Sequence, residues 1–219
     1  MKRIIKTLFA TLTLFAPLSL SSCSTEKTPA ATLDALSFTY DEDTDSYFVF
    51  EADNNQVKEV VIPATHESKQ AVGVKSVVAI GYMGFRKSKL TSIVLPDSIY
   101  LFRAEAFYDC RALASINMPS KLKTIEEHAF FRCIGITSLV LPDTVEEIGD
   151  FAFGSSGLTS ITLGKGLKKI GKDILGTENL KSVTYNSTVE DWNKIQKHEE
   201  WDKNIPSLEI QCTNGTVSV

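Results

Sequence analysis

The chain has 219 residues, of which 43% are hydrophobic, and it carries 23 Lys and Arg against 27 Asp and Glu. This length is enough for one domain with a substantial buried core. The acidic balance argues against a nucleic-acid partner, because the phosphate backbone requires a basic binding surface.

The first 22 residues have the organisation of an export signal. Lys2, Arg3 and Lys6 precede an uncharged stretch from Thr7 to Leu20, which is shorter than the roughly 20 residues of a membrane-spanning helix. It ends in Leu20-Ser21-Ser22-Cys23, which resembles the lipobox cut by bacterial lipoprotein signal peptidase. The resemblance implies that residues 1–22 are removed and that Cys23 is acylated; the alternative is an ordinary secretory signal with an incidental cysteine. We therefore expect an exported protein, lipid-anchored in the bacterial cell envelope at the outer membrane or cell surface.

Residues 23–32 are expected to form the lipidated tether, because the stretch from Ser24 to Thr32 is rich in Ser, Thr, Pro and Ala. Removal of the leader would leave 20 basic against 27 acidic residues, so the mature chain stays acidic. The lipid would then be the only membrane contact, and several acyl chains anchor a protein stably where one chain does not. With Cys23 acylated, three of the four cysteines remain, an odd number that argues against a disulfide framework.

Residues 33–56 are predicted to form an N-terminal cap. Phe38–Tyr40 and Tyr47–Phe50 have the composition of two strands around an acidic turn, which predicts a β-hairpin. Within the turn, Asp41, Asp43 and Asp45 alternate as in a calcium loop. The sixth position of that loop is Ser46, where glycine is needed, and strands flank it where helices are expected. We expect a solvated turn.

A repeat of about 23 residues dominates residues 57–185. Prolines recur at positions 96, 119 and 142, and phenylalanines recur at 107, 130 and 153. Each unit has apolar residues on one side of a short strand, a proline that ends the strand, a second short apolar segment, and an Ala-Phe turn. An irregular first coil with an insertion after Pro63 precedes these units. One such coil cannot bury enough apolar surface to fold alone, so the coils must stack and their ends need caps.

The repeated pattern Leu-x-x-Ile-x-Leu-Pro, then Ile-Gly-x-x-Ala-Phe-x-x-Cys, resembles the BspA-like leucine-rich-repeat family of bacterial surface proteins. Departures include Phe102-Arg103 for Ile-Gly, Gly164 for Pro, and Ser88 and Ser156 for Cys. The resemblance implies a mainly β, right-handed leucine-rich-repeat solenoid of 22–23-residue coils. It also implies a surface-tethered module for contact with proteins or cells, such as adhesion.

Residues 186–219 are predicted to form a C-terminal cap of a helix and a hairpin. Thr188-x-x-Asp191 resembles a capping box, and Trp192 and Ile195 share one face of the helix that follows. Leu208, Ile210 and Cys212 then alternate as a strand, ahead of an Asn-Gly hairpin signal at 214–215. Trp192 and Trp201 could serve as sugar-stacking platforms, but capping of the last coil is the preferred interpretation for Trp192.

The repeat register makes two packing predictions. Ile116 should be buried between the equivalent Ile93 and Leu139. Cys110 and Cys133 occupy the same place in adjacent coils, so their Cα atoms should lie about 4.8 Å apart, which is within disulfide range. Parallel stacking holds their Cβ atoms about as far apart, longer than a bridge prefers. We therefore favour two buried free thiols over a disulfide.

Catalytic and metal-binding constellations are missing from the sequence. His66, His128 and His198 are not paired with cysteines or carboxylates at metal-ligand spacing. No Ser-His-Asp order or phosphate-binding glycine loop is present, and the pairs Glu126-Glu127 and Glu146-Glu147 are expected on a solvated face. The sequence predicts a protein that is not an enzyme and that needs no cofactor or metal.

A partner surface is predicted where apolar residues interrupt polar outward positions. Tyr100 and Leu101 do so on the second strand, while Tyr108 and Phe131, with Phe151 nearby, should stack beside the Phe turns. The alternative is that the inserted loop after Pro63 folds over Val78 and Tyr100, or that the rings fill spaces between coils. We expect a protein partner, such as a host matrix or cell-surface protein. A glycan partner in nutrient capture is the alternative, although the serine-lined outward face of the first strand is too bland for one.

Overall fold

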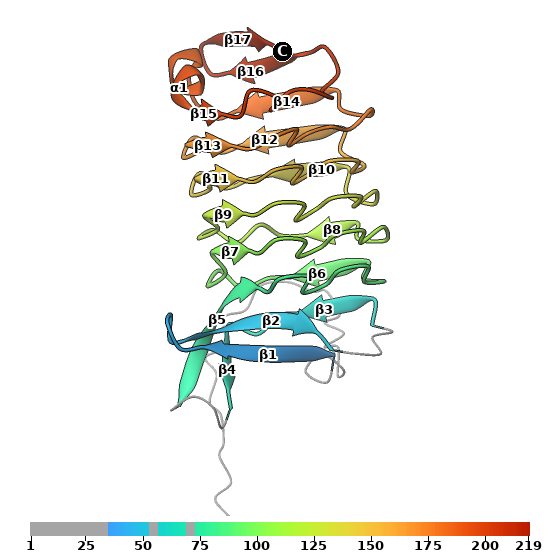
Figure 1. Ribbon diagram of the computed structural model, residues 1–219, viewed down its shortest axis with the longest axis vertical. Helices are drawn as coiled ribbons and strands as arrows, with labels where there is room; N and C mark the ends of the chain where they lie inside the picture. Colours follow the sequence, from blue (N-terminus) through green and yellow to red (C-terminus); the bar gives the residue numbers. More distant parts are fainter. Residues whose placement is uncertain (1–34, 53–56, 69–72) are drawn as a thin grey trace, which may run out of the picture.

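The computed structural model describes residues 35–52, 57–68 and 73–219, so the predicted leader and tether lie outside the described residues. The molecule is an elongated stack of coils with a β-hairpin at each end (Figure 1). Within the described residues, no helix is long and apolar enough to cross a membrane.

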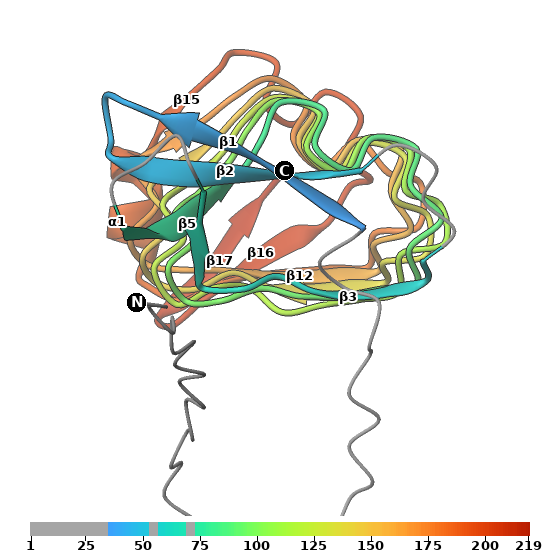
Figure 2. The ribbon, with the colours of Figure 1, turned by 90° about the horizontal axis from the view of Figure 1, so that it is seen from below.

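The hairpin β1 (Leu36–Asp41) and β2 (Ser46–Glu51) is antiparallel, and β2 also pairs in parallel with β5 (Val74–Ile80). Figure 2, a view along the stack, shows β1 and β2 crossing the end of the coils. After β3 (Glu59–Val61), the insertion forms β4 (Thr65–Glu67), which pairs antiparallel with β5. The hairpin therefore covers the first coil, which would otherwise expose its apolar interior.

Each coil contributes two short strands to two faces of the solenoid. One face is a single nine-stranded sheet in which β5 is followed by parallel strands from successive coils: β7 (Leu101–Phe102), β9 (Thr124–Ile125), β11 (Glu147–Ile148), β13 (Lys169–Ile170) and β15 (Gln196–Lys197). The other face starts at β3 and carries the predicted serine ladder: β6 (Ser92–Val94), β8 (Ser115–Ile116), β10 (Ser138–Val140), β12 (Ser160–Leu163) and β14 (Ser182–Tyr185). The predicted mainly β repeat solenoid is confirmed.

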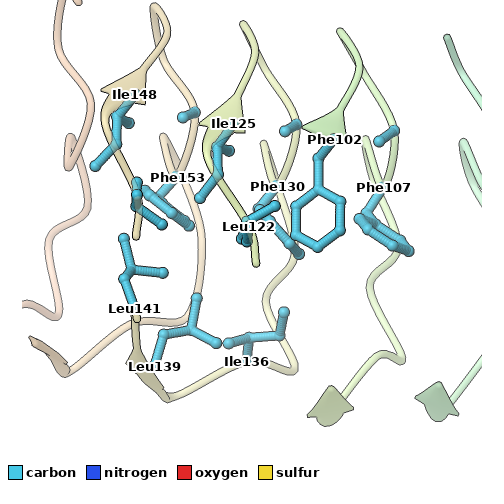
Figure 3. Packing of buried hydrophobic residues seen from close by; sticks show 14 of the residues in the cluster. Phe102, Phe107, Leu122, Ile125, Phe130, Ile136, Leu139, Leu141, Ile148 and Phe153 are labelled. Carbon is cyan, nitrogen blue, oxygen red and sulfur yellow. The ribbon is translucent and has the colours of Figure 1, made fainter. Parts of the chain in front are cut away.

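A column of phenylalanine rings runs through the core. Phe85 and Phe107 stack with their centroids 5.7 Å apart, Phe107 and Phe130 at 5.1 Å, and Phe130 and Phe153 at 5.5 Å. Phe102 takes the place that Ile125 and Ile148 hold in the next coils, and its ring meets Phe107 and Phe130 edge-on (Figure 3). Each aromatic pair adds about 0.5–1.5 kcal/mol beyond its burial, so the column ties neighbouring coils together.

The turn around each buried phenylalanine contains two residues in the left-handed region. Glu105, His128 and Phe151 occupy the first such position, with φ of 57°, 54° and 54°. The second position repeats in the same way four residues later, at Asp109, Arg132 and Ser155. All six donate their backbone N–H to a carbonyl of the following coil, for example Asp109 to Phe131 at 2.7 Å and Phe151 to Lys172 at 2.8 Å. The unusual backbone conformation therefore serves the hydrogen bonding between coils.

The C-terminal cap closes the last coil. In α1 (Val189–Lys194), Thr188 accepts a hydrogen bond from the Asp191 N–H, as the predicted capping box requires. Trp192 is 2% exposed and packs against Tyr185 and Trp201, with centroids 5.3 and 5.5 Å away, so it caps the coil and offers no sugar platform. The hairpin of β16 (Glu209–Cys212) and β17 (Gly215–Ser218) extends the sheet of β14.

The predicted burial of Ile116 is wrong. β8 pairs with β6 and β10 pairs with β12, but no strand pairing joins β8 to β10 in the part of the chain that the structure describes. The Asn117 side chain bonds both the N–H and the carbonyl of Leu95, at 2.7 and 2.8 Å, which ties β8 to the preceding coil. Ile116 is consequently only half-buried, whereas Ile93 and Ile161 are 1% and 2% exposed.

The break in the ladder predicts unequal effects of the same substitution. Ile161→Asp should lower the free energy of unfolding by several kcal/mol, because it places an unpaired carboxylate in the core. Ile116→Asp should cost clearly less, about 1–2 kcal/mol, since its side chain reaches solvent. Urea denaturation of both variants measures the difference, and equal losses would contradict the open seam between β8 and β10.

The two buried thiols act as hydrogen-bond donors to the preceding coil. Cys110 Sγ donates to the Phe85 carbonyl at 2.8 Å, and Cys133 Sγ donates to the Phe107 carbonyl at 3.0 Å. Both cysteines are free and fully buried, so the preference for thiols over a disulfide agrees with the structure. Burial raises the pKa of the Cys133 thiol well above its usual value, which keeps the unreactive thiol form at neutral pH.

We expect Cys110 and Cys133 to resist iodoacetamide in the folded protein and to react once urea unfolds it. Mass spectrometry of peptides labelled before and after unfolding measures this. Cys212, which is partly exposed, is the internal control and should be labelled first. Rapid native labelling of Cys133 would contradict its buried, thiol-donating role.

Candidate functional site

Four half-buried rings form a connected group beside the Phe turns. Tyr108 and Phe131 stack with centroids 5.4 Å apart, and His128 stacks on Phe151 at 5.2 Å. His128 also meets Phe131 edge-on at 5.3 Å, which joins the two pairs. We call Tyr108, His128, Phe131 and Phe151 the aromatic ridge. Three of them are predicted from the sequence; His128 is missed, although it stands 23 residues before Phe151 in the repeat.

Cationic side chains cover the faces of the ridge. Arg86 lies 5.0 Å from the centroid of Tyr108, Arg132 lies 5.6 Å from Phe131, and Lys172 lies 6.0 Å from Phe151. Lys172 also forms an ion pair with Glu200, and this hydrogen bond raises the pKa of the lysine. The lysine therefore stays charged at neutral pH. The ridge presents alternating rings and cations, a combination that is enriched in protein interfaces.

Two ridge residues occupy turn positions with an unusual backbone conformation. His128 and Phe151 both occupy the left-handed region, which histidine adopts readily and phenylalanine does not. The corresponding position in other coils is Met83, Glu105 or Asp173. The turn thus requires the conformation but does not require an aromatic ring. The identity of the side chain at this position is therefore free to vary between coils, and the rings of His128 and Phe151 stack on each other there.

Tyr100 and Leu101 do not belong to this group. Leu101 lies in the nine-stranded sheet between Ala79 and Thr124 and is half-buried. Ala79 is fully buried in this sheet, where it pairs with Phe48 of the N-terminal hairpin. No ring contact joins Tyr100 to the ridge within the described residues. The five predicted partner-binding residues therefore form two separate groups.

A hollow of about 1070 Å³ adjoins the ridge at its C-terminal side. Its walls come from the ridge, from the next turn of the solenoid and from the C-terminal cap, and include Phe131, Ile134, Phe151, Asp173, Glu178, Asn179, Asn204 and Ile205. Gly154 stands where Tyr108 and Phe131 stand in the two preceding coils, so the row of rings stops there. We call this space the C-terminal hollow. The sequence signal that could have revealed it is this loss of an aromatic residue at one repeat position.

A buried carboxylate lines the C-terminal hollow. Asp173 is 5% exposed, and its Oδ2 accepts a hydrogen bond from the Asn204 side chain, which lies in the cap. Its Oδ1 has no hydrogen-bond partner among the described residues, and neither has the hydroxyl of Ser156, which is also 5% exposed. A Cβ atom at Gly176 would lie 2.5 Å from Asp173 Oδ1, so glycine is needed beside this carboxylate.

The other predicted polar residues are used in structural contacts. Asp45 accepts hydrogen bonds from Tyr40 and Lys75 in the first hairpin, and His66 stacks on Phe38 with centroids 4.0 Å apart. Among the paired glutamates, Glu126 accepts from the Ala104 N–H at 2.8 Å and Glu146 pairs with Lys168. The ranges that the structure describes contain no group of three side chains placed to hold a metal ion.

Comparison with solved structures gives several bacterial leucine-rich-repeat proteins. The protein from Bacteroides ovatus is 25% identical with a TM-score of 0.63, over 75% of this chain and 45% of its own length. A T. pallidum leucine-rich-repeat protein is 22% identical with a TM-score of 0.51, over 81% of this chain and 94% of its own. The pneumococcal vaccine antigen PcpA is 19% identical with a TM-score of 0.56, over 78% of this chain and 45% of its own. The similarity to the T. pallidum protein and to PcpA shows that this chain shares their fold.

No curated protein matches the chain significantly. A family model described as the BspA type leucine-rich-repeat region matches residues 78–196 in six copies, which is more than half of the chain. The matched residues include the Phe column, the left-handed turns and the aromatic ridge. The chain therefore belongs to the BspA-type leucine-rich-repeat family.

Proposed function

We propose that this protein is a lipid-anchored binding scaffold of the bacterial cell envelope that holds a protein partner on its aromatic ridge. The observation that carries the proposal is the ridge itself: four connected, half-exposed rings, three of which have a cationic side chain over them. A repeat solenoid supplies a rigid support for such a surface. Binding, with no catalytic step, is the activity that this arrangement supports.

Aromatic and arginine side chains favour a protein partner over a nucleic acid. These residue types dominate the energetics of protein interfaces, where a few well-packed rings supply most of the affinity. The acidic chain would repel a nucleic-acid backbone. A host matrix or cell-surface protein is the partner class that we propose, for an anchored body that faces outward from the cell.

The lipid anchor accounts for how the scaffold is held at the membrane. The proposal rests on the basic leader and on Leu20-Ser21-Ser22-Cys23, which precede the described residues. Surface exposure is proposed by analogy with PcpA, which is a pneumococcal vaccine antigen.

We expect Cys23→Ala to abolish labelling with a radioactive fatty acid and to move the protein from the detergent phase to the aqueous phase. The physical reason is that acyl chains would be its only membrane contact. Ser24→Ala is the matched control and should remain lipidated. If Cys23→Ala still carried label and still partitioned into detergent, the anchor would be wrong.

For the ridge, we expect Tyr108→Ser to weaken attachment to epithelial cells and to immobilised fibronectin about tenfold, which corresponds to loss of about 1.4 kcal/mol of binding free energy. Phe151→Asn should also weaken attachment while changing the free energy of unfolding by less than about 1 kcal/mol, because asparagine tolerates the left-handed backbone. Surface plasmon resonance and thermal melting measure the two properties separately.

Two controls distinguish the ridge from other apolar surfaces. Val140→Ser removes a side chain that is 64% exposed on β10 and should leave attachment unchanged. The double variant Tyr100→Ser with Leu101→Lys tests the second predicted group and should also leave attachment unchanged. The ridge proposal fails if wild-type protein attaches to neither surface, or if Tyr108→Ser and Phe151→Asn lose stability without losing attachment separately from it.

A further inference from the structure

We propose that the C-terminal hollow binds a neutral saccharide. The hollow shares Phe131 and Phe151 with the aromatic ridge but adds polar groups from two other parts of the chain, the turn at 173–179 and the cap residue Asn204. The inference goes beyond the protein-binding role of the ridge and does not depend on it.

The size and the walls of the hollow suit a ligand of one to a few sugar rings. Ligand sites commonly occupy about 300–1,000 Å³, with apolar walls and a few placed polar groups. A pyranose ring has a face of C–H groups that packs against apolar side chains, and Phe131, Ile134, Phe151 and Ile205 supply apolar surface at the wall. The outer edge of the sugar carries hydroxyl groups, which require donors and acceptors together.

The polar lining provides both kinds of group. Glu178 supplies acceptors, Asn179 supplies a donor and an acceptor, and both are exposed in the hollow. Asn204 donates its amide N–H to Asp173 Oδ2, so its orientation is fixed and its carbonyl oxygen is left to accept from a ligand. Asp173 is therefore a positioning residue for Asn204.

Two buried polar atoms beside the hollow have hydrogen-bonding capacity that a polar ligand could use. A buried polar atom without a partner is rare and costly, yet Asp173 Oδ1 and Ser156 Oγ both lack one among the described residues. A carboxylate oxygen requires a donor, and a serine hydroxyl can donate or accept. Sugar hydroxyls meet both requirements with one chemical group. Both atoms are covered in this structure, so a ligand hydroxyl would reach them only with a small movement of the wall.

Charge excludes an anionic ligand. Asp173 and Glu178 would repel a phosphate or another anion. A neutral, hydroxyl-rich ligand is compatible with the carboxylates, the amides and the rings together. It could be a free polysaccharide or a glycan chain carried by a protein, since the chemistry of the terminal sugars is the same.

The test measures saccharide binding by the full-length lipoprotein in detergent. Isothermal titration uses maltohexaose, xylohexaose, mannohexaose and chitohexaose as free-glycan probes. A mucin before and after enzymatic deglycosylation serves as the protein-borne probe. We expect at least one probe to bind with a dissociation constant of about 1 mM or tighter, a modest affinity for a ligand of this size. Binding of a free hexasaccharide identifies a free-glycan ligand, whereas mucin binding alone, lost on deglycosylation, identifies a protein-borne one.

The variants separate the hollow from the ridge. Asn204→Ala and Asn179→Ala should each weaken saccharide binding at least fivefold, and Asn179 is exposed, so its replacement should not perturb folding. Tyr108→Ser is the matched control, because Tyr108 belongs to the ridge but not to the hollow; it should retain saccharide binding even where it loses protein attachment. The inference is overturned if no probe binds wild-type protein, or if a folded Asn179→Ala variant binds as tightly as wild type.

Discussion

The contact between the turn of one coil and the turn of the next is the interaction on which the rest of the structure depends. It combines a stacked phenylalanine with backbone hydrogen bonds donated by the left-handed residues that flank it. A coil of about 23 residues buries too little apolar surface to offset its own ordering entropy. Each turn therefore becomes stable only when its neighbour supplies the stacking ring and the accepting carbonyl.

The same turns generate the candidate binding surface. Their outward side chains project at intervals of 22 or 23 residues, so replacing one residue changes the surface without disturbing the hydrogen bonds beneath it. Tyr108 and Phe131 extend the ridge through two coils, and Gly154 ends that row and leaves space for the hollow. The turn backbone thus supplies the rigid support. The outward side chains beside it vary from coil to coil and form the surface.

Strand pairing is less uniform than the turns. The nine-stranded sheet is continuous from the N-terminal hairpin to β15, whereas the opposite face is divided between β8 and β10. Asn117 replaces strand pairing with two side-chain hydrogen bonds to Leu95 and draws the chain toward the preceding coil. The opposite face is broken between β8 and β10, but the nine-stranded sheet is continuous there and Phe130 still stacks on Phe153. These contacts keep the solenoid intact at the seam.

The sequence by itself determined the repeat, the fold class and the elements of the two caps. Regularly spaced Pro96, Pro119 and Pro142, together with the Phe column, impose one coil length, and short-range signals such as Thr188 with Asp191 act within a single turn of helix. Only the tertiary structure decided the exposure of Ile116, the membership of His128 in the ridge and the existence of the hollow. Those features depend on distances between coils and between the solenoid and its cap, as where Asn204 reaches Asp173. Periodicity specifies which residues are equivalent along the chain, but side-chain packing across coils decides which of them meet.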